Sequence, residues 1–319
     1  MTPAALAARN RGRVILAFAS VYILWGSTYL AIKYAVETIP PFFMGSTRLL
    51  IAGLVLYLAA RWRGAPAPSW LEWRTSAITG ILMLGLGNGS VIWAELTVPS
   101  GIVALIIAGV PIWMVLADWI GPHGVKPKTP VLLGLGLGLV GIAILVGPRL
   151  VTGHGGVDPV GATVLLFGSM SWAIGSIITR HRERPKSALI SIAIQMIVAG
   201  SAFAVATVAF GELPRFTMDT VTMRSVLAWV YLITGGSLIG YTAYVYLLGA
   251  VSPAKAATYA YVNPVIAVVL GWAFAHEDLS FRVILAASVI LAGVATITVA
   301  SGRGPATGEH PVPLMEDAA

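Results

Sequence analysis

The 319-residue sequence contains no cysteine and few charged residues. The absence of cysteine excludes disulfides, thiolate metal ligands and cysteine nucleophiles. Only 10% of the residues are charged, whereas a soluble domain carries about 25%. With 57% hydrophobic residues and a mean hydropathy of +0.86, the chain has too few polar side chains to cover a soluble globule. This composition excludes an ordinary soluble enzyme, a disordered chain and a nucleic-acid-binding protein, and it leaves a membrane protein.

Long apolar runs indicate transmembrane helices, since a helix needs about 20 apolar residues to cross a bilayer. Ten such runs can be placed, at Val14–Val36, Phe42–Ala60, Thr75–Ala94, Ser100–Ala117, Val131–Gly147, Val160–Thr179, Ala188–Phe210, Ser225–Leu248, Pro253–Ala275 and Phe281–Ala300. Only short loops and two short tails remain. The runs therefore predict a single all-α membrane protein without a soluble domain.

The basic residues predict how the chain is oriented. If the N-terminus is cytoplasmic, fourteen lysines and arginines fall in cytoplasmic segments and five in outer segments or at outer helix ends. By the positive-inside rule, this bias predicts that both termini are cytoplasmic. The net charge of +7 then faces anionic lipid headgroups, and no nucleic-acid partner is expected.

The two halves of the chain share a spacing pattern. Trp25 and Gly53 are 28 residues apart, and so are Trp172 and Gly200. Each half holds five apolar runs, and because five is odd, the second half begins on the opposite side of the membrane. Inverted repeats around a midplane site are typical of alternating-access transporters. The alternative is a chance alignment of apolar helices. Other matches, at offsets of 152 to 154, are Pro99-Ser-Gly with Pro253-Ala-Lys, Val110-Pro111 with Asn263-Pro264, Trp119 with Trp272, and Gly141-Ile142 with Gly293-Val294.

Short motifs are spread over both halves. They are Tyr22-Ile-Leu-Trp25-Gly-Ser-Thr-Tyr29, Gly87-Asn88-Gly89, Trp93-Ala-Glu95, Val98-Pro99-Ser-Gly101, Ser171-Trp172-Ala-Ile-Gly175-Ser176, Ser252-Pro253 and Tyr259-Ala-Tyr261-Val-Asn263-Pro264. In combination they resemble the EamA-type transporters of the drug/metabolite transporter superfamily, in particular a YedA-like branch of bacterial inner-membrane exporters. The resemblance runs from about residue 14 to residue 300.

This resemblance implies ten transmembrane helices in two inverted five-helix EamA repeats and the export of small metabolites. The expected repeats are residues 14–148 and 160–300, flanked by cytoplasmic tails at 1–13 and 301–319. One departure concerns the acidic Gly-Glu pair that usually ends the fourth helix of an EamA repeat. The first repeat reads Gly121-Pro122-His123 there, whereas the second keeps Glu277-Asp278.

Polar and aromatic residues inside the runs are candidates for lining a substrate cavity. A charge within the bilayer needs a cavity or a partner, so Arg48 can bind a substrate carboxylate or form a structural ion pair. A half-polar aromatic stripe suits cationic or amphipathic metabolites, although aromatic residues also populate the membrane interfaces. The cavity candidates are Trp25, Thr28, Tyr29, Arg48, Asn88, Trp172, Ser176, Gln195, Tyr241, Tyr244, Tyr259 and Asn263.

Charged residues at the outer ends of the runs are candidates for coupling or gating. An Arg48–Glu95 or Lys33–Glu95 pair is expected to act as a gate, as a proton-linked switch or only as a structural link. Pro111 and Pro264 lie at matching places in the two halves, where they are expected to kink the helices. Such paired breaks point to a binding site, and kinks that serve only packing are the alternative.

The run that contains Gly136-Leu-Gly138-Leu-Val-Gly141 satisfies the GxGxxG pattern, but it lacks the preceding strand that a dinucleotide site requires. Close helix packing is the better interpretation. No zinc-protease motif, nucleophile elbow or P-loop lysine occurs. We therefore expect neither a metal nor a cofactor, and we do not expect an enzyme.

Together these observations predict a multi-pass protein of the bacterial inner membrane that exports small metabolites by alternating access. Amino acids or amphipathic drug-like compounds are the expected substrates, with the proton gradient as the energy source. The expected partners are a small-molecule substrate and the lipid bilayer, with the protein acting as a monomer or a homodimer. The alternatives are a nucleotide-sugar or other metabolite exchanger, an uptake carrier, an integral-membrane enzyme acting on lipid-like substrates, and a membrane receptor.

Overall fold

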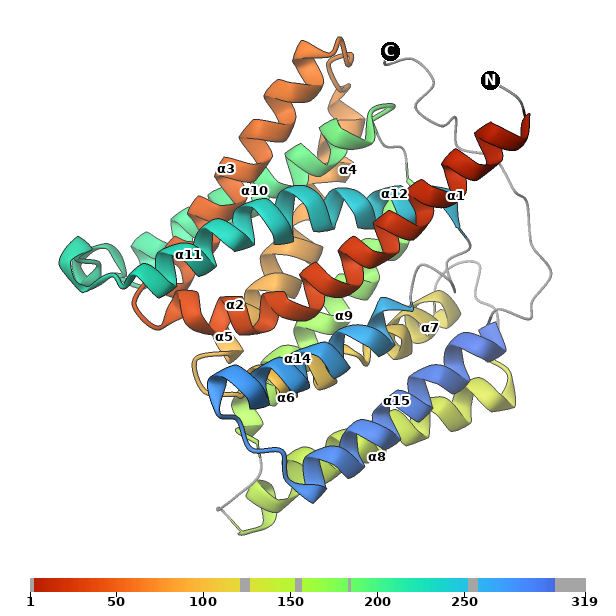
Figure 1. Ribbon diagram of the computed structural model, residues 1–319, viewed down its shortest axis with the longest axis vertical. Helices are drawn as coiled ribbons and strands as arrows, with labels where there is room; N and C mark the ends of the chain where they lie inside the picture. Colours follow the sequence, from red (N-terminus) through yellow and green to blue (C-terminus); the bar gives the residue numbers. More distant parts are fainter. Residues whose placement is uncertain (1–2, 121–126, 153–156, 183–184, 252–257, 302–319) are drawn as a thin grey trace.

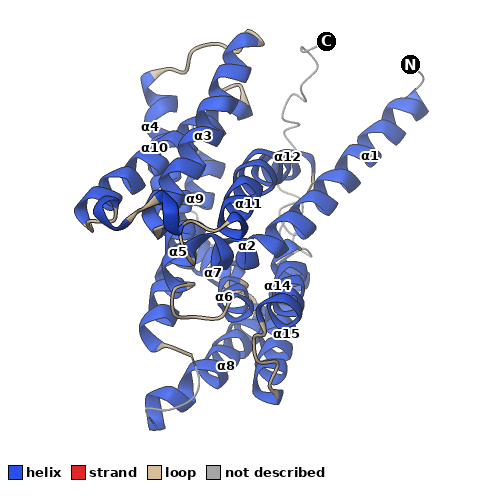
Figure 2. Cartoon of the chain, turned by 60° about the vertical axis from the view of Figure 1, so that its left-hand side comes forward, coloured by secondary structure: helices blue, strands red, loops and turns tan. Residues whose placement is uncertain are grey.

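The computed structural model describes residues 3–120, 127–152, 157–182, 185–251 and 258–301, and every regular element in these ranges is a helix (Figure 2). The elements are α1 (Pro3–Ser20), η1 (Val21–Trp25), α2 (Gly26–Val36), α3 (Pro41–Trp62), α4 (Trp70–Gly80), η2 (Ile81–Asn88), α5 (Gly89–Ala94), α6 (Ser100–Ile107), α7 (Val110–Ile120), α8 (Thr129–Thr152), α9 (Pro159–His181), α10 (Ala188–Ala209), η3 (Leu213–Arg215), η4 (Met218–Thr220), α11 (Met223–Tyr231), η5 (Leu232–Tyr241), α12 (Thr242–Ala250), α14 (Tyr259–Ala275) and α15 (Phe281–Ser301). Of these, η1, η2 and η5 are π-helical, while η3 and η4 are single 3₁₀ turns.

Seven helical segments among the described residues are long and apolar enough to cross a membrane. They are Arg11–Val36, Pro41–Trp62, Trp70–Ala94, Ser100–Ala117, Pro159–Thr179, Ala188–Ala209 and Met223–Leu247, and three shorter apolar helices accompany them at Thr129–Leu145, Val262–Ala275 and Phe281–Ile297. Helix α1 begins at Pro3 and so includes most of the segment expected as the N-terminal tail. Residues 253–257 of the ninth run, the Gly121-Pro122-His123 corner and nearly all of the expected C-terminal tail lie outside the described residues.

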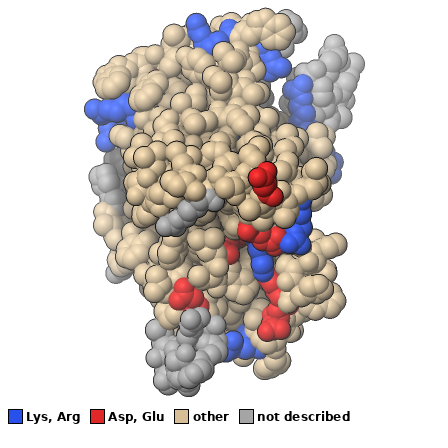
Figure 3. Space-filling model, turned by 90° about the vertical axis from the view of Figure 1, so that its left-hand side faces the viewer, with Lys and Arg blue, Asp and Glu red and all other residues tan. Residues whose placement is uncertain are grey.

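Helix α3 shows how the surface suits a lipid environment. Ile51, Leu54, Val55 and Leu58 form one stripe along this helix, and each is between 41% and 58% exposed. Arg48, on the same helix, is buried. A continuous apolar stripe is unfavourable in water but matches the hydrocarbon core of a bilayer. Figure 3 shows an end of the molecule where acidic side chains gather beside Lys and Arg, while most of the visible surface carries neither.

Local sequence signals explain where several helices begin. Proline is tolerated in the first turn because its missing N–H would have no helical partner there, and α3 and α9 begin at Pro41 and Pro159. The Asp158 side chain accepts hydrogen bonds from the N–H groups that open α9. Ser69 and Glu72 form a reciprocal capping box at the start of α4.

Two helix pairs pack closely through glycine. In the α3–α10 pair, Gly53 lies against the carbonyl oxygen of Ala193, and Gly200 lies against the N–H of Leu50. In the α8–α15 pair, a Cβ added to Gly134 or to Gly293 would lie 2.6 Å from the carbonyl oxygen of the other (Figure 1). The missing side chains therefore let both pairs approach to backbone contact, as in other membrane helix pairs.

Two of the three glycines of the GxGxxG pattern also pack against neighbouring helices. A Cβ on Gly138 would meet Ile112, and one on Gly141 would meet Ile290 and the carbonyl oxygen of Ala286. Gly136 has nothing within 4 Å of its added Cβ. The interpretation as packing glycines is confirmed for Gly138 and Gly141, while Gly136 faces open space.

Gly134→Ala is expected to lower the free energy of unfolding by about 1–3 kcal/mol, because the new methyl group overpacks against the α15 backbone. The matched control is Gly136→Ala, two residues away on the same helix. It meets no atom within 4 Å and gains up to about 1 kcal/mol of helix propensity. Thermal unfolding of both purified variants in detergent, followed by circular dichroism, checks the difference. Equal stability of the two variants would contradict the backbone contact.

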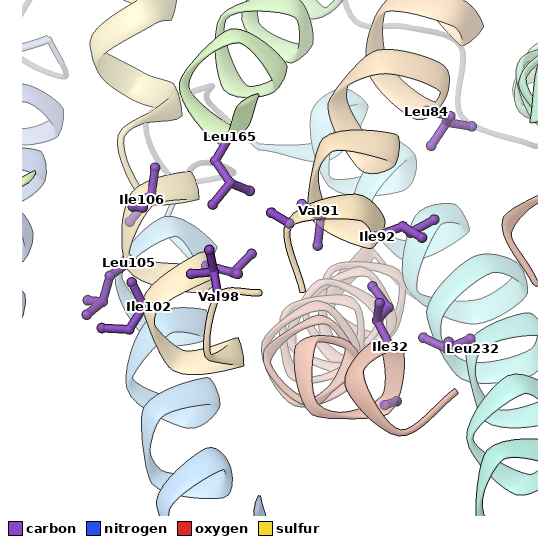
Figure 4. Packing of buried hydrophobic residues seen from close by; sticks show 14 of the residues in the cluster. Ile32, Leu84, Val91, Ile92, Val98, Ile102, Leu105, Ile106, Leu165 and Leu232 are labelled. Carbon is purple, nitrogen blue, oxygen red and sulfur yellow. The ribbon is translucent and has the colours of Figure 1, made fainter. Parts of the chain in front are cut away.

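The apolar core lies where the central helices converge. Ile32 of α2, Ile92 of α5, Leu105 of α6, Leu165 of α9 and Leu232 of η5 are at most 1% exposed. Figure 4 shows Ile32 and Leu232 pointing toward each other, and Leu165 pointing toward Ile106 and Val98. Ile32 also lines the cavity described next, whereas none of the described lining residues comes from α8 or α15.

Candidate substrate cavity

A cavity of about 770 Å³, counting the open space at its mouth, lies among the central helices. Nine of the predicted cavity residues line it, namely Trp25, Thr28, Tyr29, Arg48, Asn88, Trp172, Tyr241, Tyr259 and Asn263. The other lining residues are Ile32, Leu49, Leu84, Gly87, Val91, Ile107, Val110, Gly168, Ser169, Met196, Gly236 and Ser237. Both halves of the chain thus contribute to one mostly apolar space with a few polar groups, which is the usual character of a small-molecule site.

Three π-helical segments border the cavity. Trp25 ends η1, Asn88 ends η2, and Tyr241 ends η5. A π-helical turn holds one more residue than an α-helical turn and often occurs at functional sites. The prediction of helix kinks from prolines missed these segments. The glycines of Gly85-Leu-Gly87-Asn88-Gly89 and Gly235-Gly236 are the sequence feature that could have indicated an irregular helix in η2 and η5.

Trp25 is the centre of an aromatic cluster. Its ring centroid lies 4.9 Å from that of Tyr244, 5.5 Å from Tyr259, 6.1 Å from Trp172 and 6.2 Å from Tyr241. The indole N–H donates to the carbonyl oxygen of Gly236 at 3.2 Å. The cluster joins side chains from four segments that are distant in the sequence, so it fixes one wall of the cavity.

Arg48 projects from α3 into the cavity with 6% of its surface exposed. Its Nε donates to the Ser237 hydroxyl of η5 at 2.9 Å, whereas Nη1 has no hydrogen-bond partner among the described residues. A Cβ on Gly236 would lie 3.2 Å from Nη2, so this glycine leaves room for the guanidinium. The contact between Ser237 and Arg48 could not be derived from the spacing of residues in the sequence.

Two amides face the same cavity from different halves of the chain. Asn88 lies at the end of η2, and Asn263 lies in α14, where it is 3% exposed. Their Oδ1 atoms have no hydrogen-bond partner within the described part of the chain. Buried amide oxygens are costly unless a donor reaches them, so both are available to a ligand.

Three predicted cavity residues lie beside the cavity and not on its wall. Gln195 accepts a hydrogen bond from the Tyr241 hydroxyl at 2.5 Å and donates to Thr79 at 3.1 Å, so it orients a lining tyrosine. Tyr244 packs on Trp25 behind the wall. Ser176 donates to the carbonyl oxygen of Trp172 one turn earlier in α9.

The expected Glu95 ion pairs are not present among the described residues. Lys33 instead pairs with Glu277, with its Nζ 2.7 Å from Oε1. Arg224 pairs with Glu37 in the one other ion pair between described residues. Glu95 is 6% exposed, lies within electrostatic range of Lys33 and Glu277, and has no hydrogen-bond partner for either oxygen. The predicted pairs thus named Lys33 but not its partner Glu277.

Glu277 lies at a corner that joins three helices. His276 adopts a left-handed conformation, with φ of 53°, at the end of α14 and turns the chain back. The Glu277 carboxylate then accepts bonds from the Ser100 N–H at 2.7 Å, the Ser100 hydroxyl at 2.8 Å and the Gly101 N–H at 3.0 Å, which open α6. We call Lys33, Ser100, Gly101 and Glu277 the Glu277 corner. It links α2 and α6 of the first half to α14 of the second.

The two predicted helix-breaking prolines differ in position. Pro264 lies inside α14, one residue after the cavity residue Asn263. Pro111 is the second residue of α7, where α6 has ended at Ile107 and a new helix begins. Proline has no backbone N–H, and in the first turn of a helix an N–H would have no acceptor within that helix. Pro111 therefore marks a break between two helices and not a kink within one.

Within the described ranges, no three His, Asp or Glu side chains gather closely enough to hold a metal ion. The cavity presents one guanidinium, two amides, hydroxyls and aromatic rings.

Two stretches of the chain, residues 12–147 and 159–299, match the model of the EamA-like transporter family. The chain belongs to the EamA-like transporter family. The inner membrane transporter YedA of Escherichia coli K12 is 37% identical over 302 residues, which cover 94% of each chain. The family and its similarity to YedA make this chain a membrane transporter.

More distant EamA relatives carry other names. Protein PecM of Dickeya dadantii is 26% identical over 81% of this chain and 82% of its own. The "Probable amino-acid metabolite efflux pump" of Salmonella typhimurium is 23% identical over 86% of this chain and 91% of its own. One crystal structure superposes with a TM-score of 0.65 at 20% identity, covering 92% of this chain and 99% of the other. That similarity shows a shared fold.

Proposed function

We propose that this EamA transporter is a secondary active exporter that carries small metabolites through the central cavity by alternating access. The observation that carries the proposal is the cavity itself. Arg48 and Asn88 reach it from the first family match, and Asn263 and Tyr241 reach it from the second. A site shared between two halves can open to either side as the halves rock against each other.

The proposed architecture is ten spans in two inverted repeats, with both termini in the cytoplasm of a bacterium and the protein in its inner membrane. The paired glycines support it. Gly53 and Gly200, which correspond in the repeat pattern, pack α3 and α10 against each other. Gly141 and Gly293, which also correspond, do the same for the last helix of each half, where they lie against Ala286 and Gly134. Such reciprocal contacts are expected where a two-fold axis relates the repeats. Either a monomer or a homodimer fits this architecture.

Amino acids are proposed substrates, supported by the name of the Salmonella relative and by the mixed polar and aromatic cavity wall. Amphipathic drug-like compounds fit the same wall. Coupling to protons is proposed through Glu95, because a buried carboxylate without a hydrogen-bond partner is stable in a membrane protein when it carries a proton. Metabolite exchange or uptake would use the same cavity and is an outcome of the test below.

Proton coupling predicts that a pH gradient drives flux. In proteoliposomes, a ¹⁴C-labelled amino-acid mixture is expected to accumulate several-fold with a pH gradient, and a protonophore should abolish this. Glu95→Gln is expected to keep downhill flux but lose the gradient dependence. Glu72→Gln is the matched control, because Glu72 lies outside the cavity lining and glutamine still completes its capping box.

The outcomes separate the parts of this proposal. Flux that is equal with and without the gradient, and unaffected by Glu95→Gln, contradicts proton coupling. Flux that requires substrate on both sides identifies an exchanger. No flux above that of protein-free liposomes, for the amino acids or for an amphipathic dye, contradicts the transport function.

A further inference from the structure

We propose that Arg48 binds a carboxylate of the transported molecule, so that the cavity selects organic acids, zwitterions included, over their uncharged or purely cationic counterparts. This inference rests on the proposed transport function, because it assigns the charge that the substrate of that same cavity must carry. It is argued from the unbalanced charge of Arg48, from the two amides across the cavity and from the aromatic wall.

The charge of Arg48 is not balanced by the protein residues that the structure describes. The side chain is 6% exposed, and its Nε hydrogen bond goes to the neutral hydroxyl of Ser237. Neither of the two described ion pairs includes Arg48. A buried charge without a counter-ion is costly, and a charge inside a membrane normally faces a partner or a cavity. An anionic group in the cavity supplies the missing partner.

The described carboxylates of the neighbouring helices are committed elsewhere or lie beyond contact. Glu277 binds Lys33 and the start of α6, and Glu212 accepts bonds from the N–H groups of Phe42 and Phe43 at the start of α3. Glu37 pairs with Arg224. Glu95 interacts electrostatically with Lys33 and Glu277, and neither of its oxygens is hydrogen-bonded to Arg48.

A purely structural role for Arg48 would leave most N–H donors of its guanidinium without a hydrogen-bond partner. The Arg48–Ser237 bond links α3 to η5, but it engages only Nε. Nη1 remains without a partner, and it belongs to a side chain that lines the cavity. A planar guanidinium offers several N–H donors in a fork that matches the two oxygens of a carboxylate. The geometry thus leaves part of the fork available to a ligand.

The rest of the cavity indicates what else the acid carries. The Oδ1 atoms of Asn88 and Asn263 lack donors, so a ligand hydroxyl, amide or ammonium group would satisfy them. The rings of Trp25, Tyr29 and Tyr259 offer faces for an apolar body or for a cation. Chloride would satisfy Arg48 but would leave the amides and rings without contacts. An organic acid with an apolar body and a hydrogen-bond donor would contact the guanidinium, the amides and the rings.

The test uses two matched pairs of probes on the purified full-length protein near neutral pH. The first pair is 3-phenylpropionate and 3-phenylpropionamide, an anion and its neutral analogue. The second is L-leucine and L-leucinamide, a zwitterion and its cationic analogue. Ligand-dependent thermal shifts give dissociation constants for each probe. The proteins compared are the wild type, Arg48→Gln, Arg48→Lys and the control Arg63→Gln, which removes an exposed arginine at the end of the same helix.

In the wild type and in Arg63→Gln, at least one acid is expected to bind about tenfold to a hundredfold more tightly than its amide, as for hydrogen bonds to charged groups. The ratio should fall to about one in Arg48→Gln. Arg48→Lys keeps the charge but loses the fork, so it should lower the ratio without abolishing binding. This variant preserves the test if the neutral variant does not fold.

Three results would overturn the inference. One is an acid-to-amide ratio near one in the wild type for both pairs, absence of binding included. Another is an acid preference that persists in Arg48→Gln. The third is a thermal shift from sodium chloride alone that equals that of the acids. A failure of the proposed transport function looks different, because acids would then bind with the Arg48-dependent preference while no probe crosses proteoliposomes.

Discussion

Replacing Trp25 by alanine is expected to lower the free energy of unfolding by about 3 kcal/mol, at the lower end of the range for buried aromatic side chains. The reason is its central place in the cluster, where the indole contacts four other rings and donates a hydrogen bond to Gly236. Part of the ring faces the cavity, which keeps the loss below the upper limit. Thermal or SDS unfolding of the purified protein, followed by circular dichroism, measures the change.

Two further variants separate the causes. Trp25→Phe keeps a ring but loses the N–H donor, and it is expected to cost about 1 kcal/mol, the usual value of one hydrogen bond. Trp62→Ala is the matched control, because Trp62 is 90% exposed at the end of α3. It should change stability by less than about 0.5 kcal/mol. A Trp25→Ala protein as stable as the Trp62→Ala protein would show that the cluster does not hold the helices together.

Glu277→Ala is expected to cost about 2–4 kcal/mol, because it leaves Lys33 unpaired and removes the acceptor of three bonds from the start of α6. Asp278→Asn is the matched control one residue later, since Asp278 is exposed. Pairing with Lys33→Met in a double-mutant cycle isolates the ion pair from the helix cap. A cycle with no coupling energy would contradict the Lys33–Glu277 contact.

The same corner should respond to acid. Burial alone raises the pKa of the Glu277 carboxyl, but the bonds from Lys33 and from the N–H groups of Gly101 and Ser100 outweigh burial and lower the pKa below its ordinary value. A carboxyl with a lowered folded-state pKa stabilises the protein above its unfolded-state pKa, and this stability is lost as the pH falls through the folded-state value. Acidification should thus destabilise the wild type more than Glu277→Gln. Parallel pH dependences of the two proteins would contradict this.

The apolar runs and the cavity wall could be predicted from the sequence because both depend on local patterns. A charge or an amide within an apolar run has few favourable places in a membrane, so Arg48, Asn88 and Asn263 were identified as cavity candidates from their positions alone. In the structure, all three line the same cavity. Their proposed roles in transport stay predictions until flux is measured.

The π-helical segments and the Glu277 corner could not be predicted in the same way. A 3.6-residue period assumes a regular helix, and each π-helical turn inserts one residue and rotates everything beyond it by about 100°. Lys33 finds Glu277 across 244 residues, and the backbone turn at His276 that aims the carboxylate has no simple sequence pattern. Glu95, 62 residues away along the chain, was the nearer acid in sequence but not the partner in space.

The open position of Gly136 gives direct experimental access to the proposed conformational cycle. Nothing lies within 4 Å of an added Cβ at Gly136 in α8 or at Gly12 in α1, and the chain has no native thiol. The double variant Gly12→Cys/Gly136→Cys therefore accepts two spin labels without background labelling. Electron-spin distance distributions between α1 and α8, recorded with and without each probe acid, would test whether the proposed states are populated.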